Sequence, residues 1–387
     1  MVNPYAFTGP VRDPAMFFGR RTLRHDILDG LRRGESFAIT GTVRIGKSSL
    51  LFRLRHALRE QLKAPAGAAL VPVLVRNRDF SGPSLSIVCQ RIVDELGAAL
   101  SAPESAEDWQ RGLRLFSGNL EDGETIRAFT EAIATIMRAR GADSRLVLMI
   151  DDVDRLSQHA WSRVLFDELR QLVQKASDGV RISLLVTGDF VPWSSPEALR
   201  SPFPDIAITL KTLGLLSADE TGELVTRPTG IDGESAIVSS IVFETGGHPF
   251  LAKYLMNKLV DAIDGDLTRA TPEALRGIVD LYFSERADFR RWALRFTDGD
   301  RRAYDLIASG QGATRDDLLR GLGNPQQASR AIQVLVQTGV VSEEQPGSDR
   351  YVVGGEMFRR WFYDTRQLST STNTEAVVVR SPRQPPL

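Results

Sequence analysis

The sequence contains little cysteine and histidine. Cys89 is the only cysteine among 387 residues, so an internal disulfide is excluded, and this usage suits a reducing cytosol. Cys89 lies in an apolar pattern of helical spacing, which predicts a buried thiol rather than a nucleophile. The four histidines, at positions 25, 56, 159 and 248, are scattered and show no metal-ligand spacing. We therefore expect neither a disulfide-bonded scaffold nor a histidine-ligated metal centre.

Long apolar runs are also missing. No stretch of about 18 apolar residues occurs, and the first residues do not combine a charged stretch with an apolar one. We therefore expect no membrane span, no signal peptide and a cytoplasmic protein. The net charge of −1 provides no general basic field for nucleic acid or anionic lipid. The composition, 42% hydrophobic and 25% charged, is that of a globular protein, and 387 residues suffice for two or three domains.

What the sequence does contain is one strong motif. Residues 41–48 have the sequence GTVRIGKS, which fits the phosphate-binding loop pattern G-x-x-x-x-G-K-[ST]. The two glycines let backbone N–H groups face phosphate oxygens, the lysine reaches the β- and γ-phosphates, and the serine hydroxyl ligates Mg²⁺. An apolar strand pattern at 36–40 and a helical pattern at 49–58 flank the loop, which disfavours a chance match. The predicted nucleotide-binding residues are Gly41, Thr42, Val43, Arg44, Ile45, Gly46, Lys47, Ser48 and Ser49.

A second motif is an acid pair that follows a predicted buried strand. Residues 146–150 are five consecutive apolar residues, as in a parallel strand that is covered on both faces. Asp151 and Asp152 follow at the carboxyl end, where α/β sheets place their ligands. We expect Asp151 to hold Mg²⁺ together with Ser48. The alternative, a strand that ends in a helix N-cap, fits Asp154 but does not account for an acid pair downstream of a phosphate-binding loop.

Further segments complete a predicted α/β domain over residues 20–214, after an extended lead-in at 1–19. The polar stretch at 101–122 is interpreted as a loop or insertion. The other predicted strands lie at 69–75, 180–188 and 206–210.

Taken together, these motifs resemble the AAA+-like ATPases. They are similar in particular to the signal-transduction ATPases with numerous domains (STAND) and to archaeal and origin-recognition ATPases. An apolar-Gly-Arg stretch at 16–20, a short helix closed by Gly34, a strand and the phosphate loop carry this resemblance. It implies ATP or ADP with Mg²⁺ as the ligand, and a base near Phe18, Gly19 and Arg20, although Phe18 also suits a core. No N-K-x-D motif for guanine is present.

The resemblance also implies catalytic positions. Asp152 stands where many relatives carry a Glu that polarises the attacking water, and because Asp is one methylene shorter we expect slow hydrolysis. Thr187 is the candidate for a polar sensor of the γ-phosphate, with Asp189 as the second candidate. Arg200 is a candidate finger that acts on the nucleotide of a neighbouring subunit; a solvated arginine is the alternative.

A second domain is predicted at 215–297, where residues 217–220 have the spacing of a capping box. Within it the sequence ETGGHPFL, at 244–251, resembles the G-x-P motif of STAND proteins. The two glycines end one helix, and Pro249 begins the next. The resemblance implies that His248 and Pro249 contact the nucleotide. An ordinary turn between two helices is the alternative.

A third domain is predicted at 298–366, and it has the element order of a winged helix, which the resemblance also implies. The helix in the recognition position carries one basic residue, Arg330, which favours a structural or regulatory role over DNA reading. The segment 367–387 is rich in Ser and Thr and then in Pro, which predicts a disordered tail. The predicted helices lie at 300–309, 314–322 and 325–339, and the predicted strands at 340–342 and 350–353.

The sequence thus predicts an ATP-binding, slowly hydrolysing switch. Its nucleotide state would control domain opening, and thereby the binding of a protein partner or nucleotide-dependent self-assembly. Two rival hypotheses remain: an initiator-like or regulatory ATPase that binds DNA through its winged helix, and a nucleotide-bound scaffold without turnover. No effector domain and no sensor repeats are recognisable in the sequence.

Overall fold

The computed structural model forms two compact units, Thr8–Gly214 and a second one made of Met1–Phe7 and Leu215–Leu387. The chain therefore passes between the units twice, once before Thr8 and once after Gly214. Each unit is described by itself. The structure describes residues 3–5, 8–62, 69–76, 84–100, 106–116, 120–140, 143–174, 181–188, 208–285, 288–294, 296–345 and 347–375.

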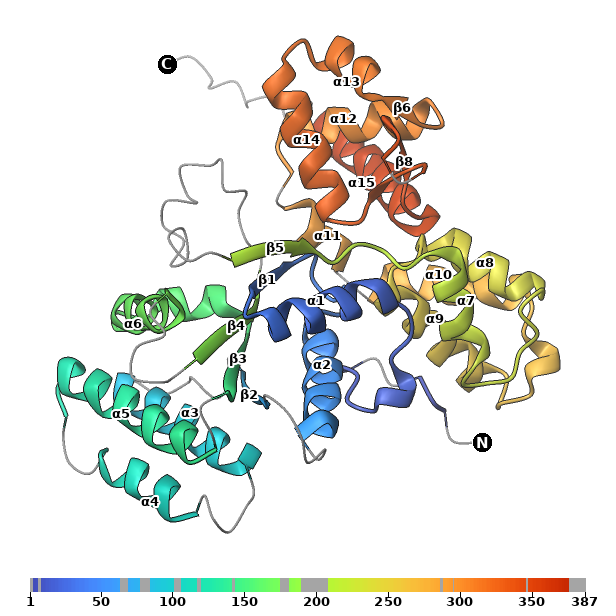
Figure 1. Ribbon diagram of the computed structural model, residues 1–387. Coiled ribbons are helices and arrows are strands. Elements are labelled where there is room, and N and C mark those ends of the chain that lie inside the picture. The colour runs from blue at the N-terminus through green and yellow to red at the C-terminus, as the bar shows by residue number, and fades with distance from the viewer. Residues whose placement is uncertain are drawn as a thin grey trace, which may run out of the picture. The chain divides into compact units, whose positions relative to one another are not determined.

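The unit Thr8–Gly214 is built around a parallel sheet of five strands in the order β2-β3-β4-β1-β5 (Figure 1). Four of the strands are almost wholly buried, as their continuous apolar runs predict, and only the edge strand β5 is exposed. The predicted strands agree with the observed ones to within two residues at each end. The bounds are β1 Ser36–Thr40, β2 Leu70–Arg76, β3 Arg145–Asp151, β4 Arg181–Thr187 and β5 Ile208–Thr212.

Helices cover both faces of this sheet. On one face, alternate residues of β3 and β4 pack into a common core with α3, α5 and α6 (Figure 1). On the other face, α2 packs against β2 and β3, and α1 approaches β1 so closely that a Cβ on Gly30 would collide with the Phe37 ring. The helices are α1 Arg21–Arg33, α2 Lys47–Leu62, α3 Leu85–Leu100, α5 Asp122–Arg140 and α6 Ser162–Gln174; a 3₁₀ helix, Val153–Gln158, precedes α6.

The prediction of a loop over residues 101–122 was wrong, because α4 spans Ala106–Arg114 within it. The segment contains three Glu, three Leu and two Arg, which favour helices, but only a few of its residues reach the core. Gly112 is buried because α4 approaches α5 there, so that a Cβ would lie 3.3 Å from that of Ala132.

In the second unit, five helices follow one another after Leu215. The predicted capping box is confirmed: Ser217 Oγ accepts from the Glu220 amide at 3.1 Å, and Glu220 Oε2 accepts from the Ser217 amide at 3.2 Å. The predicted break at the two glycines is also confirmed, since Gly246 ends α8 with φ 56° and Pro249 begins α9. The helices are α7 Ala218–Thr226, α8 Ala236–Thr245, α9 Pro249–Ala262, α10 Pro272–Glu285 and α11 Asp288–Ala293.

The first residues of the chain also belong to the second unit, although the sequence predicted only an extended lead-in. Asn3 Nδ2 donates to the Asn257 carbonyl at 2.8 Å and to Asp261 Oδ1 at 2.7 Å, both on α9. Tyr5 is 0% exposed, and its hydroxyl donates to the Val225 carbonyl on α7 at 2.5 Å. Tyr5 is thus part of the core of this unit, and Asn3 holds the chain against α9.

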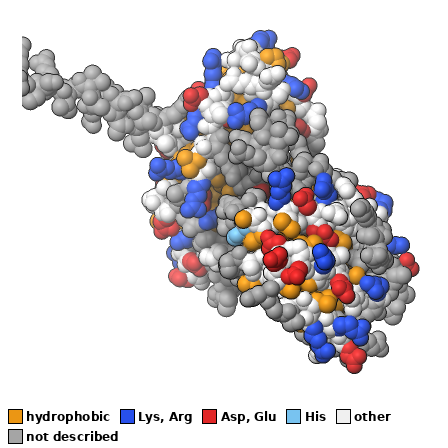
Figure 2. Space-filling view, turned by 90° about the vertical axis from the view of Figure 1, so that its left-hand side faces the viewer, with side chains coloured by type: hydrophobic (Ala, Val, Ile, Leu, Met, Phe, Trp, Pro, Cys, Tyr) orange, Lys and Arg blue, Asp and Glu red, His pale blue; other side chains and the backbone are white. Residues whose placement is uncertain are grey.

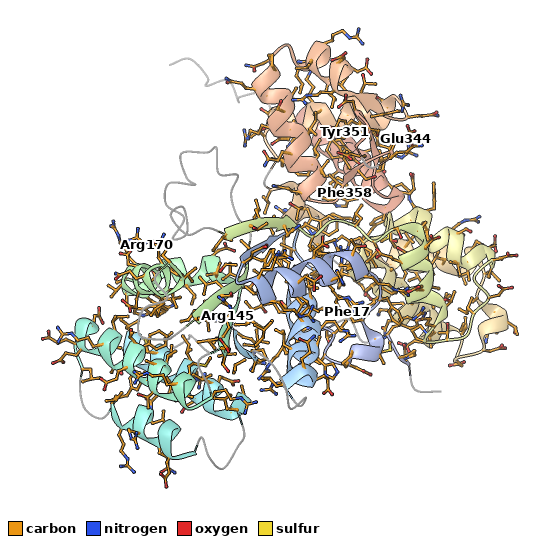
Figure 3. All side chains as sticks on the ribbon, in the orientation of Figure 1. Phe17, Arg145, Arg170, Glu344, Tyr351 and Phe358 are labelled. Carbon is orange, nitrogen blue, oxygen red and sulfur yellow. The ribbon has the colours of Figure 1, made fainter. Side chains whose placement is uncertain are left out.

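The remaining described elements combine four helices with a small antiparallel sheet of order β6-β8-β7. The sequence missed β6 because a strand of two residues shows no alternation. An aromatic cluster joins α11 to α15, with Phe358 among its members (Figure 3). The backbone of α15 continues to Glu375, beyond the predicted start of the disordered tail at 367, because extending an anchored helix costs little. The bounds are α12 Asp298–Ser309, β6 Ala313–Thr314, α13 Arg315–Leu322, α14 Pro325–Gln337, β7 Val341–Glu343, β8 Arg350–Val353 and α15 Glu356–Glu375.

None of the helices within the described ranges combines the length and the apolar character that a membrane span requires.

Candidate functional site

The predicted phosphate-binding loop connects β1 to α2. Its two glycines have positive φ angles, 153° at Gly41 and 107° at Gly46, which side-chain-bearing residues adopt rarely. A Cβ on Gly41 would also lie 2.7 Å from the Leu213 carbonyl, whereas at Gly46 only the backbone angle demands glycine. Arg44 has φ 66° and is exposed together with Val43, so the tip of the loop faces outward. This succession of angles is what turns several N–H groups toward one point.

The first residues of α2 carry the polar groups of the site. Lys47 is buried, and its ammonium donates to the carbonyls of Gly41 at 2.6 Å and Thr42 at 3.2 Å. Ser49 Oγ accepts from the Val11 amide at 3.0 Å, so its side chain anchors the segment that precedes α1. The positive end of the α2 dipole adds to the charge of Lys47.

The acid pair lies at the same edge of the sheet. Ser48 Oγ donates to Asp151 Oδ1 at 3.0 Å, which joins the loop to the end of β3. Thr187 Oγ1 donates to the same carboxylate oxygen at 2.7 Å and accepts from the Asp152 amide at 3.1 Å. Ser48, Asp151 and Thr187, three of the predicted site residues, therefore converge on one oxygen atom.

The strand order explains this convergence. β4 lies between β1 and β3, with Ile39 opposite Thr187 and Ile150 opposite Val186. Since all three strands are parallel, their carboxyl ends meet at one edge of the sheet. Thr187 therefore stands between the loop after β1 and the acids after β3.

The donor set fits Mg²⁺ together with nucleotide phosphates. A hydroxyl and a carboxylate oxygen are ligands that Mg²⁺ prefers, and it usually completes its shell with phosphate oxygens and water. Over the described residues, no group of three or more His, Cys, Asp or Glu could hold a metal ion.

Asp152 has an unusual backbone conformation. Its φ and ψ are 56° and 51°, in the left-handed region, and it caps the 3₁₀ helix Val153–Gln158 without a side-chain hydrogen bond to that helix. A non-glycine residue in this region costs about 1–2 kcal/mol, least for Asn and Asp. The side chain of Asp152 is half-buried at the end of β3.

Asp154 was not predicted to belong to the site. Its carboxylate lies directly over Gly188, where an added Cβ would be only 2.5 Å from Asp154 Oδ1. Gly188 follows Thr187 at the end of β4, so a third carboxylate reaches this edge of the sheet. The D-x-x-D spacing from Asp151 to Asp154 was visible in the sequence. The contact between Asp154 and Gly188 could not be predicted, because it depends on β3 and β4 being neighbours in the sheet.

The residues predicted to lie near the base are at the start of α1. Phe18 is half-buried, Gly19 is buried with φ 73°, and Arg20 caps α1 with φ 59°. Arg20 Nη2 donates to the Gly214 carbonyl at 2.6 Å and lies 3.5 Å from the Ile45 carbonyl in the phosphate loop. Arg20 therefore lies next to the loop, where its guanidinium binds backbone carbonyls. The contact of these three residues with a base remains a prediction.

The two predicted residues of the G-x-P motif belong to the second unit. His248 is 1% exposed, and its ring stacks on Trp292 with a centroid distance of 4.8 Å. Pro249 is half-buried at the first position of α9. Their contact with a nucleotide remains a prediction. The candidate finger Arg200 and the second sensor candidate Asp189 lie outside the described residues.

The comparisons with known proteins agree with this geometry. Residues 31–192 match a family model described as an AAA domain. The chain is 24% identical over 357 residues to an uncharacterised WD repeat-containing protein of Synechocystis. This match covers 88% of the chain but only 28% of the length of that relative.

Two solved structures are similar over almost the whole chain. The Walker-type ATPase PABY2304 of Pyrococcus abyssi is 17% identical, with a TM-score of 0.54 and coverage of 93% of this chain and 99% of that one. The ORC2 protein of Aeropyrum pernix, solved in ADPNP and ADP complexes, is 13% identical, with a TM-score of 0.50 and coverage of 95% and 98%. At these identities the likeness shows the fold alone, and it confirms the predicted α/β fold of a P-loop, AAA+-like domain.

Proposed function

We propose that this chain binds Mg²⁺·ATP at the sheet edge marked by Ser48 and Asp151, hydrolyses it slowly and acts as a STAND-type switch. One observation carries the proposal: Ser48 and Thr187 both donate to Asp151 Oδ1, at 3.0 and 2.7 Å. This arrangement brings together a hydroxyl from the start of α2, the carboxylate at the end of β3 and a polar sensor position at the end of β4. Each of these groups has a distinct part in phosphate chemistry.

Each polar residue of the site has its own proposed role. The N–H groups of the loop and the ammonium of Lys47 hold the β- and γ-phosphates, and Lys47 must leave the Gly41 carbonyl to do so. Ser48 and Asp151 would hold Mg²⁺, which when bound would neutralise phosphate charge. Thr187 orients Asp151, and Asp152 orients the attacking water. Because Asp152 is shorter than Glu and is held in a left-handed conformation, we propose slow turnover.

The switch part of the proposal rests on how such domains are combined with others. The Synechocystis relative is a WD repeat-containing protein, and this chain matches 28% of its length. STAND ATPases combine one nucleotide-binding module with repeats or with a separate partner. We propose that the nucleotide state of this chain controls its contact with a protein partner or with further copies of itself.

The C-terminal elements support a winged helix that is not specialised for DNA. Three helices, α12 to α14, precede the paired strands β7 and β8, which is the required order. The last residue of β7, Glu343, and two acids in the connection to β8, Glu344 and Asp349, are exposed and would repel phosphates. Among the described side chains on the face shown in Figure 2, acidic and basic groups are interspersed. We therefore propose that this domain contacts protein rather than DNA.

The experiment is the solution mass of the purified protein, measured by light scattering with saturating Mg·ADP or a non-hydrolysable Mg·ATP analogue. Lys47→Ala is the control, with phosphate release measured in parallel. A rise in mass with the ATP analogue that is lost in Lys47→Ala is the result expected for self-assembly. An unchanged mass would exclude nucleotide-dependent self-assembly, so that the switch would act through a protein partner. Equal ATP binding by Lys47→Ala and the wild type would overturn the proposal.

A further inference from the structure

The segment from Leu213 to Leu216 joins the two compact units, and on its first side it is anchored to the phosphate-binding loop. The Leu213 amide donates to the Thr40 carbonyl at 2.8 Å, at the end of β1. The Leu213 carbonyl lies so close to Gly41 that a Cβ there would be 2.7 Å away. Leu213 itself is buried. Any movement of the start of the loop therefore acts directly on Leu213.

On its other side the same segment is anchored to the turn that precedes His248. The Leu216 amide donates to the Gly247 carbonyl at 2.9 Å. A Cβ on Gly247 would lie 2.1 Å from the Leu216 carbonyl, so this contact requires glycine. Only Gly214 and Leu215 separate the two anchors, and the boundary between the compact units falls between these two residues.

Arg20 holds the middle of this connection. Its Nη2 atom donates to the Gly214 carbonyl at 2.6 Å and is 3.5 Å from the Ile45 carbonyl. The first contact is a short, charge-assisted hydrogen bond, while the second is at the limit of one. In a loop whose N–H groups face the phosphates, carbonyls face the opposite way, and the Ile45 carbonyl is within reach of Arg20. One guanidinium can therefore be shared between the loop and the last residue of the first unit.

We propose that Arg20 is a positioning residue that couples the state of the phosphate-binding loop to the Leu213–Leu216 segment, and through Leu216 to the turn at Gly246 and Gly247. This inference rests on the proposed switch function. The bistable part is the guanidinium, whose bonding shifts between the carbonyls of Ile45 and Gly214 when the loop closes on phosphates. The space beside Gly214 is open, because a Cβ at this position would meet no atom within 4 Å.

The test measures one distance between the units by pulsed electron paramagnetic resonance. Spin labels are placed at His56→Cys on α2 and Ser239→Cys on α8, both at exposed positions. The native Cys89 is buried and stays unlabelled. Distances are recorded at saturating Mg·ADP and at a saturating non-hydrolysable Mg·ATP analogue, so that a change in affinity does not affect the result.

The variants are Arg20→Gln, Arg20→Lys and, as a matched control at the exposed end of the same helix, Arg33→Gln. In the wild type and in Arg33→Gln, we expect the distance between the two spin labels to differ between Mg·ADP and the Mg·ATP analogue. Arg20→Gln should lose this difference in distance. Arg20→Lys, which keeps the charge and one donor nitrogen, should restore part of it. Thermal melting establishes that each variant is folded.

Two results would contradict the account, and they are distinguishable. If Arg20→Gln and Arg20→Lys both shift as the wild type does, Arg20 is not the coupling residue, while the proposed switch stands. If the wild type binds both nucleotides but shows no shift, the switch itself is refuted, and this inference with it.

Discussion

Thr187 and Asp151 form the central contact of the site: Thr187 Oγ1 donates to Asp151 Oδ1 at 2.7 Å. The same hydroxyl accepts from the Asp152 amide at 3.1 Å, and the same carboxylate oxygen accepts from Ser48. A single buried hydroxyl thus fixes the orientation of the expected metal ligand and the backbone of the residue expected to orient water.

Thr187→Val should lower ATP turnover by about 10–100-fold, the usual effect of removing a group that orients a metal ligand. Valine keeps the shape of threonine but leaves the Asp152 amide and Asp151 without their shared partner. Thr187→Ser keeps the hydroxyl and serves as the control. Phosphate release at saturating Mg·ATP is the measurement, and equal turnover in Thr187→Val and the wild type would contradict the role given to this contact.

Asp152→Asn should abolish turnover but preserve the fold. Asparagine tolerates the left-handed conformation at position 152, whereas Asp152→Ala should reduce the free energy of unfolding by about 1 kcal/mol relative to Asp152→Asn. Chemical denaturation and phosphate release together check this pair. Full turnover in a correctly folded Asp152→Asn would show that another group orients the water, and Asp154, which lies over Gly188, is then the next candidate.

Cys89 should not react with a thiol reagent in the native protein at pH 8. Burial, with a further contribution from the nearby Asp122 and Glu168 carboxylates, raises the pKa of this thiol well above its usual range. Both the low thiolate fraction and the lack of access suppress attack. Complete reaction is expected in denaturant. Rapid stoichiometric labelling of the native protein would show that the core around α3 opens readily.

Tyr5→Phe should destabilise the second unit by about 1 kcal/mol, because it removes the hydrogen bond to the Val225 carbonyl. Burial raises the pKa of Tyr5 from 10.0 to about 12. Between these two values the unfolded chain loses the phenolic proton while the folded chain keeps it. The stability of the wild type should therefore fall as pH rises from about 10 to about 12, and less so in Tyr5→Phe. Equal pH profiles of unfolding for the two proteins would contradict this.

The parts of the fold that could be predicted are those whose signals are local. The loop glycines, the apolar run before Asp151 and the Gly-Gly-Pro turn each specify their backbone within a few residues. The sheet order could not be predicted in this way, because it depends on how distant strands pair. The position of Thr187 between the loop and Asp151 follows from that order.

The features that the sequence did not reveal involve long-range contacts. Tyr5 packs on α7, more than 200 residues away, and no local pattern announces a partner at such a distance. The stacking of the His248 ring on Trp292 was not predicted either, because these two residues are distant in the sequence. Position 188 has no room for a side chain because the Asp154 carboxylate lies over it, and position 247 has none because the Leu216 carbonyl lies there. Each of these requires knowledge of which segments meet.

The most direct test of the account is the effect of Mg²⁺ on the affinity for a fluorescent ATP analogue, in the wild type and in Asp151→Asn. Asp167→Asn, an exposed acid on α6, is the matched control. The account predicts that Mg²⁺ tightens binding to the wild type and to Asp167→Asn, and that Asp151→Asn loses this effect while still binding the analogue. An unchanged Mg²⁺ effect in Asp151→Asn would contradict the assignment of Ser48 and Asp151 as the metal site.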